Sequence, residues 1–172
     1  MSDLDDTIVA ISTPLGSGGI GIIRISGKTA FEIVSKIFRG SKPFSDIRSH
    51  TINYGKIVDF WTNEVIDEVL VSKMKTPNTF TKEDVVEINT HGSLIVLKNI
   101  LLLITKLGAR AAKPGEFTKR AFLNGRIVLS QAEAVMDLIN AKTDASLKAS
   151  INQLDGKLSK ALSSIRSKLI EI

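Results

Sequence analysis

Three glycines near the start of the chain have the spacing of a phosphate-binding loop. Gly16, Gly18 and Gly21 fit the pattern G-x-G-x-x-G, in which glycines let the backbone turn tightly and approach a pyrophosphate at a helix N-terminus. The residues that follow are the β-branched run 22–25, which predicts a strand instead of the required helix. We therefore favour a glycine-rich connection between two strands over a nucleotide-binding loop.

Composition disfavours metal and thiol chemistry. The 172-residue chain has no cysteine, which excludes disulfides, thiol nucleophiles and thiolate metal sites. Its two histidines, His50 and His91, lie far apart in the sequence, and we predict no metal site. His91 precedes Gly92 at an expected strand-to-helix turn, which favours a local hydrogen-bonding role. We assign no catalytic residue.

Targeting and membrane-spanning signals are lacking in this sequence. The N-terminal residues 1–7 are acidic and have no apolar region of the kind that a secretory signal needs. The longest apolar cluster, around residues 94–104, contains Lys98 and Asn99 and is too short to cross a bilayer. We expect a cytoplasmic protein with no membrane partner.

Positive charge is concentrated in the second half of the chain. Residues 1–90 carry a net charge of −2, whereas residues 91–172 carry +7. One basic window is opposed only by Glu116 and contains Arg110, Lys113, Lys119, Arg120 and Arg126. Such a window could attract a polyanion or a polycarboxylate, and an ordinary solvated face is the competing interpretation.

The first two thirds of the sequence predict alternating strands and helices. A helix has its apolar face at Ala30, Ile33, Val34 and Ile37 and ends at Gly40, and a second helix covers residues 93–107 and is closed by Gly108. The expected strands are Thr7–Ser12, Ile20–Ser26, His50–Trp61, Glu64–Met74 and Asp84–Asn89, with the third and fourth joined as a hairpin across Thr62 and Asn63. This pattern predicts an α+β domain with a mixed β-sheet that ends near residue 120.

Two patterns predict which side chains are buried. In the strand Asp84–Asn89, Val86 and Ile88 face one way while Glu87 faces the other, because strand side chains alternate. The helix at 93–107 is apolar nearly all round, so we expect it to be well buried and to cover the sheet.

The last part of the chain predicts helices only. Ser130 and Glu133 fit a capping box that opens a helix. Beyond it, apolar residues recur every three or four positions from Leu147 to Ile172, interrupted by Gly156. This stripe needs another helix or chain to bury it, and it has no stop signal at Ile172, so we expect the polypeptide to be a fragment.

Four segments together resemble a known family. They read DTIVAISTPLGSGGIGIIRISG, NTFTKEDVVEINTHGS, AKPGEFTKRAFLNGRI and LSQAEAVMDLINAKTDAS. Essentially the whole chain is similar to the N-terminal region of the MnmE/TrmE family of tRNA modification GTPases. The combination of PGEFTKRAFLNG with QAEA is far more specific than the glycine spacing.

The resemblance implies a domain plan. Residues 1–120 would form a folate-binding and dimerising domain, similar to the folate domain of glycine-cleavage aminomethyltransferases. Residues 121–172 would form the first helices of a central all-α domain. GTP, Mg²⁺ and K⁺ would belong to a separate G domain that this chain does not contain.

The resemblance also implies site residues. The family's folate contacts fall on Arg24, Glu87 and Arg126, and the ligand would be 5-formyl- or 5,10-methylene-tetrahydrofolate. A carboxylate such as Glu87 can accept hydrogen bonds from the adjacent N–H groups of a pterin, and arginines can bind the oxygens and the glutamate tail. The family often has Lys in place of Arg126 and usually has Gly in place of Lys82.

The family's function follows as an expectation for the parent protein. It would modify carbon 5 of the wobble uridine in tRNA together with a flavoprotein partner, using a one-carbon unit from folate. The present chain would bind folate and form a homodimer without catalysing a reaction by itself. Two alternatives stay open: a basic RNA-docking module that uses residues 110–126, and a free-standing folate-dependent aminomethyltransferase.

Overall fold

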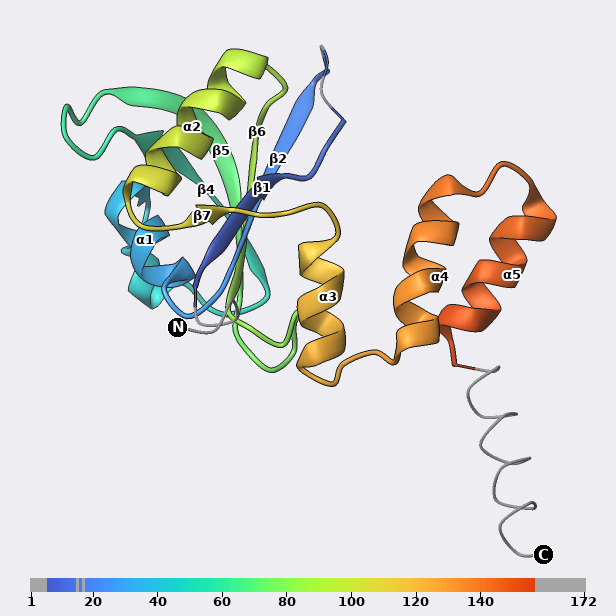
Figure 1. Cartoon of the computed structure of the whole chain (residues 1–172). Coiled ribbons are helices and arrows are strands. Elements are labelled where there is room, and N and C mark those ends of the chain that lie inside the picture. Colours follow the sequence, from blue (N-terminus) through green and yellow to red (C-terminus); the bar gives the residue numbers. More distant parts are fainter. Residues whose placement is uncertain (1–5, 15, 17, 157–172) are drawn as a thin grey trace, which may run out of the picture. The chain divides into compact units, whose positions relative to one another are not determined.

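The computed structural model describes residues 6–14, 16 and 18–156 (Figure 1). The chain divides into two compact units, Met1–Phe117 and Thr118–Ile172. The first unit contains a mixed sheet and its covering helices, and the second contains helices. This is the α+β fold that the sequence predicts.

The first unit is built on a seven-stranded sheet with the order β3-β4-β5-β6-β2-β1-β7. All neighbouring strands are antiparallel except β1 and β7, which are parallel. The strands are β1 (Ile8–Ile11), β2 (Ile20–Ser26), β3 (Phe38–Gly40), β4 (Thr51–Val58), β5 (Val65–Met74), β6 (Val85–His91) and β7 (Arg110–Ala111). The two edge strands β3 and β7 are the shortest, which limits pairing with other chains.

Helices α1 (Ala30–Ile37) and α2 (Leu94–Lys106) both pack on one face of this sheet (Figure 1). Alternation along the strands sends one set of side chains into this core and the other set to the opposite face, called here the open face. The core residues of β2, β6 and β5 are Ile23, Ile25, Val86, Ile88, Val69 and Val71. Arg24 and Glu87 alternate with them and therefore lie on the open face, as expected for Glu87 from the sequence.

Lys73 is a buried lysine whose charge is satisfied by backbone carbonyl groups. The Nζ atom of Lys73 donates hydrogen bonds to the carbonyl oxygens of Phe44, Ser45 and Ile47 at 3.0, 3.1 and 3.0 Å. The ammonium also lies 5.2 and 5.0 Å from the ring centroids of Phe31 and Phe44. Burial lowers the pKa of Lys73. These contacts hold the short 3₁₀ helix η1 (Phe44–Asp46) against the sheet.

Most of the expected strands are confirmed, and two expectations about helices are wrong. The first helix ends at Ile37 instead of Gly40, because residues 38–40 pair with β4 as an edge strand. The second helix is not buried all round: Leu94, Ile95 and Leu102 are exposed by 54, 71 and 47%. Its buried face is Leu97, Ile100, Leu103 and Ile104.

The hairpin between β4 and β5 is confirmed, with a longer connection than the two residues expected. The Oδ1 atom of Asp59 accepts hydrogen bonds from the backbone N–H groups of Trp61 and Thr62 at 2.8 and 3.0 Å. Asn63 takes a left-handed backbone conformation with φ of 59°. The aspartate therefore organises the turn before β5 begins at Val65.

The glycine-rich segment connects β1 to β2, as predicted, and Gly21 lies inside a strand. Gly21 continues into β2 and no helix begins directly after it, so the nucleotide-loop interpretation lacks its helix N-terminus. The backbone of this segment instead packs against Gly92, where an added Cβ would lie 2.1 Å from the carbonyl oxygen of Gly18. Glycine at this position thus permits a close approach of two backbones.

Three helices follow β7. They are α3 (Glu116–Leu123), which spans the division between the units, α4 (Leu129–Asn140) and α5 (Asp144–Leu154). The Nε2 atoms of Gln131 and Gln153 donate to the carbonyl oxygens of Leu154 and Ser130 at 2.5 and 2.8 Å. These side chains link α4 and α5 within the second unit.

Two expectations for the helical part need correction. Helix α4 begins before the predicted capping box of Ser130 and Glu133, since the backbone N–H of Val128 donates to Oε1 of Gln131. The apolar stripe is not one continuous helix, because α5 ends at Leu154 and Gly156 adopts a φ of 74°. The stripe beyond residue 156 lies outside the described residues.

Candidate functional site

An ion pair between Arg24 and Glu87 lies on the open face of the sheet. The two residues are directly opposite each other on β2 and β6, 63 positions apart in the sequence. The Nε and Nη2 atoms of Arg24 both lie 2.7 Å from a single oxygen, Oε1 of Glu87. The side chains are 34 and 25% exposed, so the pair is accessible from one side.

This arrangement leaves hydrogen-bonding capacity unused. Oε1 of Glu87 accepts a hydrogen bond from Nε of Arg24, and the ion-pair contact with Nη2 falls on the same oxygen. Among the described residues, neither Oε2 of Glu87 nor Nη1 of Arg24 has a hydrogen-bond partner. The pair therefore presents a charged acceptor and a charged donor next to each other.

The surroundings of the pair are part polar and part apolar. Ser72 on β5 lies opposite Glu87, and Asn89 lies two residues further along β6 on the same face. The Nδ2 atom of Asn89 donates to the carbonyl oxygen of Leu70 at 3.1 Å, which fixes the amide. The ring of Phe117 approaches the guanidinium of Arg24, with 5.7 Å from Cζ to the ring centroid. A flat ring system with polar edges and apolar faces would suit these neighbours.

Arg126, the third residue that the resemblance implies, lies in the second unit. It follows α3 in a turn in which Gly125 has a φ of 67°, and its backbone N–H donates to the carbonyl oxygen of Ala121 at 2.9 Å. Its side chain is exposed. The first unit alone brings Arg24 and Glu87 together.

The basic window is less available to a polyanion than its composition suggests. Arg110 donates from Nε to Asp6 at 2.6 Å and from Nη1 and Nη2 to the two oxygens of Glu116 at 3.1 and 2.6 Å. These two carboxylates raise the pKa of Arg110. Arg120 is only 1% exposed. Two of the five basic residues thus serve internal structure, which weakens the RNA-docking alternative.

His91 is held by a carboxylate on the neighbouring strand. Its Nδ1 lies 2.7 Å from Oδ1 of Asp67, and its backbone N–H donates to Oδ2 of the same carboxylate at 2.8 Å. This hydrogen bond, together with the charge of Asp67, raises the pKa of His91. The histidine therefore has the local hydrogen-bonding role that its position in the sequence indicates.

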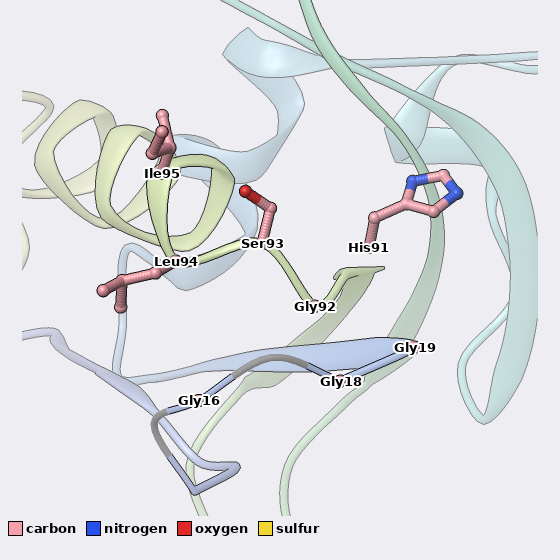
Figure 2. Close-up of a pocket in the computed structure, with 8 residues that line it drawn as sticks. All are labelled: Gly16, Gly18, Gly19, His91, Gly92, Ser93, Leu94 and Ile95. Atoms are coloured by element: carbon pink, nitrogen blue, oxygen red, sulfur yellow. The ribbon is translucent and has the colours of Figure 1, made fainter.

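An open cleft of about 670 Å³ lies between the glycine-rich segment and the start of α2. Figure 2 shows Gly16, Gly18 and Gly19 passing beside Gly92, with the ring of His91 directed away from Ser93. The described lining offers few polar side chains that converge on one point. The cleft therefore lacks the cluster of charged groups found at Arg24 and Glu87.

Sequence reasoning missed Phe117 and Asp67. Phe117 lies within the quoted segment AKPGEFTKRAFLNGRI, but only the fold places its ring against Arg24. Asp67 lies on β5, and nothing in the sequence around it indicates a contact with His91, which is 24 positions away. Strand pairing brings Asp67 to His91, and the packing of the start of α3 against β2 brings Phe117 to Arg24.

Metal sites and membrane spans are absent from the described part of the chain. No group of three or more His, Asp or Glu side chains is placed there to hold a metal ion. Within the same residues, no helix is both long and apolar enough to cross a bilayer.

Fold and site together define a class: a mixed-sheet α+β domain that carries an arginine–glutamate ion pair on its open face, followed by helices. The chain matches the model for the GTP-binding protein TrmE N-terminus over residues 7–126 and the model for the MnmE helical domain over residues 129–172. It therefore belongs to the MnmE/TrmE family of tRNA modification GTPases, as its N-terminal region.

Curated relatives agree with this assignment. The chain is 69% identical over 168 residues to the tRNA modification GTPase MnmE of Acetivibrio thermocellus, covering 98% of this chain and 37% of that protein. It is 60% identical to MnmE of Lactiplantibacillus plantarum and 57% identical to MnmE of Streptococcus pneumoniae, covering 97 and 96% of this chain. The chain spans 36% of the length of each of these two relatives.

The backbone explains one difference from the family pattern. Lys82 adopts a left-handed conformation with φ of 56°, a region that glycine enters without the steric cost that a Cβ brings. The glycine that the family resemblance implies at this position would therefore suit the backbone better than lysine does.

Proposed function

We propose that this chain is the folate-binding and dimerising part of a tRNA modification GTPase. The observation that carries the proposal is the Arg24–Glu87 ion pair, with Oε2 and Nη1 unused among the described residues. Membership of the family supports the same ligand, because the family resemblance implies folate contacts at these two residues. The ligand is a tetrahydrofolate carrying a one-carbon unit at N5, or bridging N5 and N10.

The chemistry of a pterin suits this pair. One edge of the pterin ring carries N–H donors beside a carbonyl acceptor. Oε2 of Glu87 accepts from such a donor, and Nη1 of Arg24 donates to the neighbouring oxygen, as charge-assisted hydrogen bonds. Arg126 contributes a cation for the anionic tail.

The remaining functions belong to the parent protein. We propose that it acts in the cytoplasm with a flavoprotein partner to modify carbon 5 of the wobble uridine, using the one-carbon unit that this region binds. A boundary near residue 120 separates the folate domain from the helical domain. GTP hydrolysis resides in a G domain outside this chain, since the printed sequence contains no G-x-x-x-x-G-K-[ST].

The homodimer forms through the α+β domain, and the exposed apolar side of α2 supports this. Ile95 of α2 is 71% exposed and Trp61 of the β4–β5 connection is 58% exposed, and both line a groove of about 520 Å³. Glu64 and Lys106 supply opposite charges at this groove. A surface that carries both signs can pair with its own copy across a two-fold axis.

Calorimetric titration of the chain with 5-formyl-tetrahydrofolate tests the proposal. We expect saturable binding that changes little with salt, because a ligand held in a site releases few counterions compared with a nucleic acid. The control is a titration with a GTP analogue, for which we expect no saturable heat. Absence of saturable folate binding contradicts the proposed function.

A further inference from the structure

Phe117 is an aromatic residue in contact with the ion pair, and it comes from a different element. Arg24 and Glu87 lie on β2 and β6, whereas Phe117 is the second residue of α3. Its ring centroid lies 5.7 Å from Cζ of Arg24, within the range of a cation–π contact. The guanidinium is thus contacted by a carboxylate and by an aromatic ring.

Glu116, the residue before Phe117, holds the start of α3 in place. Glu116 is only 7% exposed and accepts hydrogen bonds from Nη1 and Nη2 of Arg110 and from the backbone N–H of Lys113 at 2.7 Å. Arg110 is bound in turn to Asp6. These hydrogen bonds hold the first turn of α3 against β7, so the backbone that carries Phe117 is fixed in place.

We propose that Phe117 is a positioning residue for the ligand site. A guanidinium is planar and its N–H donors have fixed directions, so a ring against it restricts how it can rotate. The ring holds Arg24 in the orientation in which Nε and Nη2 both reach Oε1 of Glu87. Nη1 and Oε2 are thereby kept available for the ligand. The inference rests on the proposed folate function for its effect on affinity.

One readout is independent of folate. The Nε–H of Arg24 is hydrogen-bonded and gives a proton–nitrogen NMR signal, which Arg24→Lys identifies by its loss. We expect Phe117→Leu to move this signal, because the ring and its local magnetic field are removed. The matched control is Phe122→Leu, the same change on the same helix at a residue that is 39% exposed. It should leave the signal in place.

The second readout is affinity for 5-formyl-tetrahydrofolate, measured by calorimetry on the same full chains. Phe117→Leu should bind about three- to tenfold more weakly, the range for loss of a cation–π contact that is partly exposed. Phe117→Trp should restore binding to within about twofold, because indole is the best cation–π partner. If Phe117→Leu does not fold, Phe117→Met replaces it.

The two readouts separate two kinds of failure. An unmoved Arg24 signal, or unchanged affinity in Phe117→Leu while the wild type binds folate, overturns the positioning role. If the wild type binds no folate, the proposed function fails instead. The Arg24 signal then tests by itself the contact of the Phe117 ring with the guanidinium, on which the positioning role depends.

Discussion

Two arginines of the first unit are paired with glutamates in different ways. Arg110 uses Nε, Nη1 and Nη2 on the carboxylates of Asp6 and Glu116, and Nη1 also donates to the carbonyl oxygen of Ala111 at 2.9 Å. Arg24 instead directs Nε and Nη2 to one oxygen of Glu87. Glu116 is almost fully buried, whereas the Glu87 side chain is 25% exposed.

The two pairs therefore have different roles: the charges of Arg110 and Glu116 are used within the fold, whereas those of Arg24 and Glu87 are available to a ligand. The Arg110 pair satisfies its donors internally and fixes the start of α3. The Arg24 pair retains one donor and one acceptor on an accessible face. The same residue types therefore serve stability in one place and recognition in the other, and substitutions should divide along this line.

The largest effect on stability is expected at Glu116. Glu116→Gln removes a charged acceptor from Arg110 and places an amide N–H toward existing donors. It should lower the free energy of unfolding by about 3 kcal/mol, since hydrogen bonds to charged groups and buried unpaired donors each cost that order. Urea unfolding monitored by circular dichroism measures the change.

A matched control lies on the open face. Glu68 pairs with Lys56 at 3.6 Å, and both side chains are about half exposed, 52 and 47%. Glu68→Gln should change the free energy of unfolding by less than about 0.5 kcal/mol, because exposed ion pairs contribute little. Equal effects of the two glutamate substitutions would remove the distinction between the two pairs.

Arg24→Ala should act on ligand binding and leave folding intact. It removes one charged donor to the ligand, so affinity for 5-formyl-tetrahydrofolate should fall by about ten- to a hundredfold. The midpoint of thermal unfolding should stay close to that of the wild type. A large drop in the thermal midpoint of Arg24→Ala would show that Arg24, like Arg110, serves the stability of the fold.

Arg126→Lys should have a small effect. It keeps the positive charge and restores the residue that is commoner in the family, so it should cost less than about 1 kcal/mol of folate binding if Arg126 acts as a cation. Calorimetry measures this cost. A loss of more than about tenfold would show instead that the forked geometry of arginine is required.

The smallest effect concerns pH. Asp67 raises the pKa of His91 in the folded chain above its ordinary value of 6.5, so folding favours the protonated imidazole. The resulting stabilisation is fully present below pH 6.5 and is lost as the pH rises through the raised pKa. The difference in unfolding free energy between wild type and His91→Gln should therefore shrink from about pH 6 to about pH 8.

The same pH dependence should disappear in Asp67→Asn, because the amide carries no charge to favour the imidazolium. Urea unfolding at the two pH values measures both variants. A constant difference between wild type and His91→Gln across this range would contradict the assignment of Asp67 as the cause.

Local periodicity was sufficient to predict much of the fold. The bounds of β2 follow from its β-branched run, and the alternation of Val86, Glu87 and Ile88 places the carboxylate on the face away from the core. These features depend on neighbours in the sequence. They are therefore available without the structure.

Features that depend on distant pairing could not be predicted. The sequence of Phe38–Gly40 predicts the end of a helix, and only its pairing with β4 makes it an edge strand. The exposed side of α2 also carries large apolar residues, Leu94, Ile95 and Leu102, so periodicity alone cannot show that these residues are uncovered. The contact of Arg24 with Glu87 requires the register of β2 and β6, which no local pattern encodes.

The most direct test of the central claim is the folate affinity of Glu87→Gln beside that of Glu68→Gln. Both variants change a carboxylate of the open face to an amide, and both should keep the wild-type thermal midpoint. We predict that Glu87→Gln loses about 2–4 kcal/mol of binding to 5-formyl-tetrahydrofolate in calorimetry, whereas Glu68→Gln binds like the wild type. Unaltered affinity in a folded Glu87→Gln chain would contradict the assignment of the ion pair as the folate site.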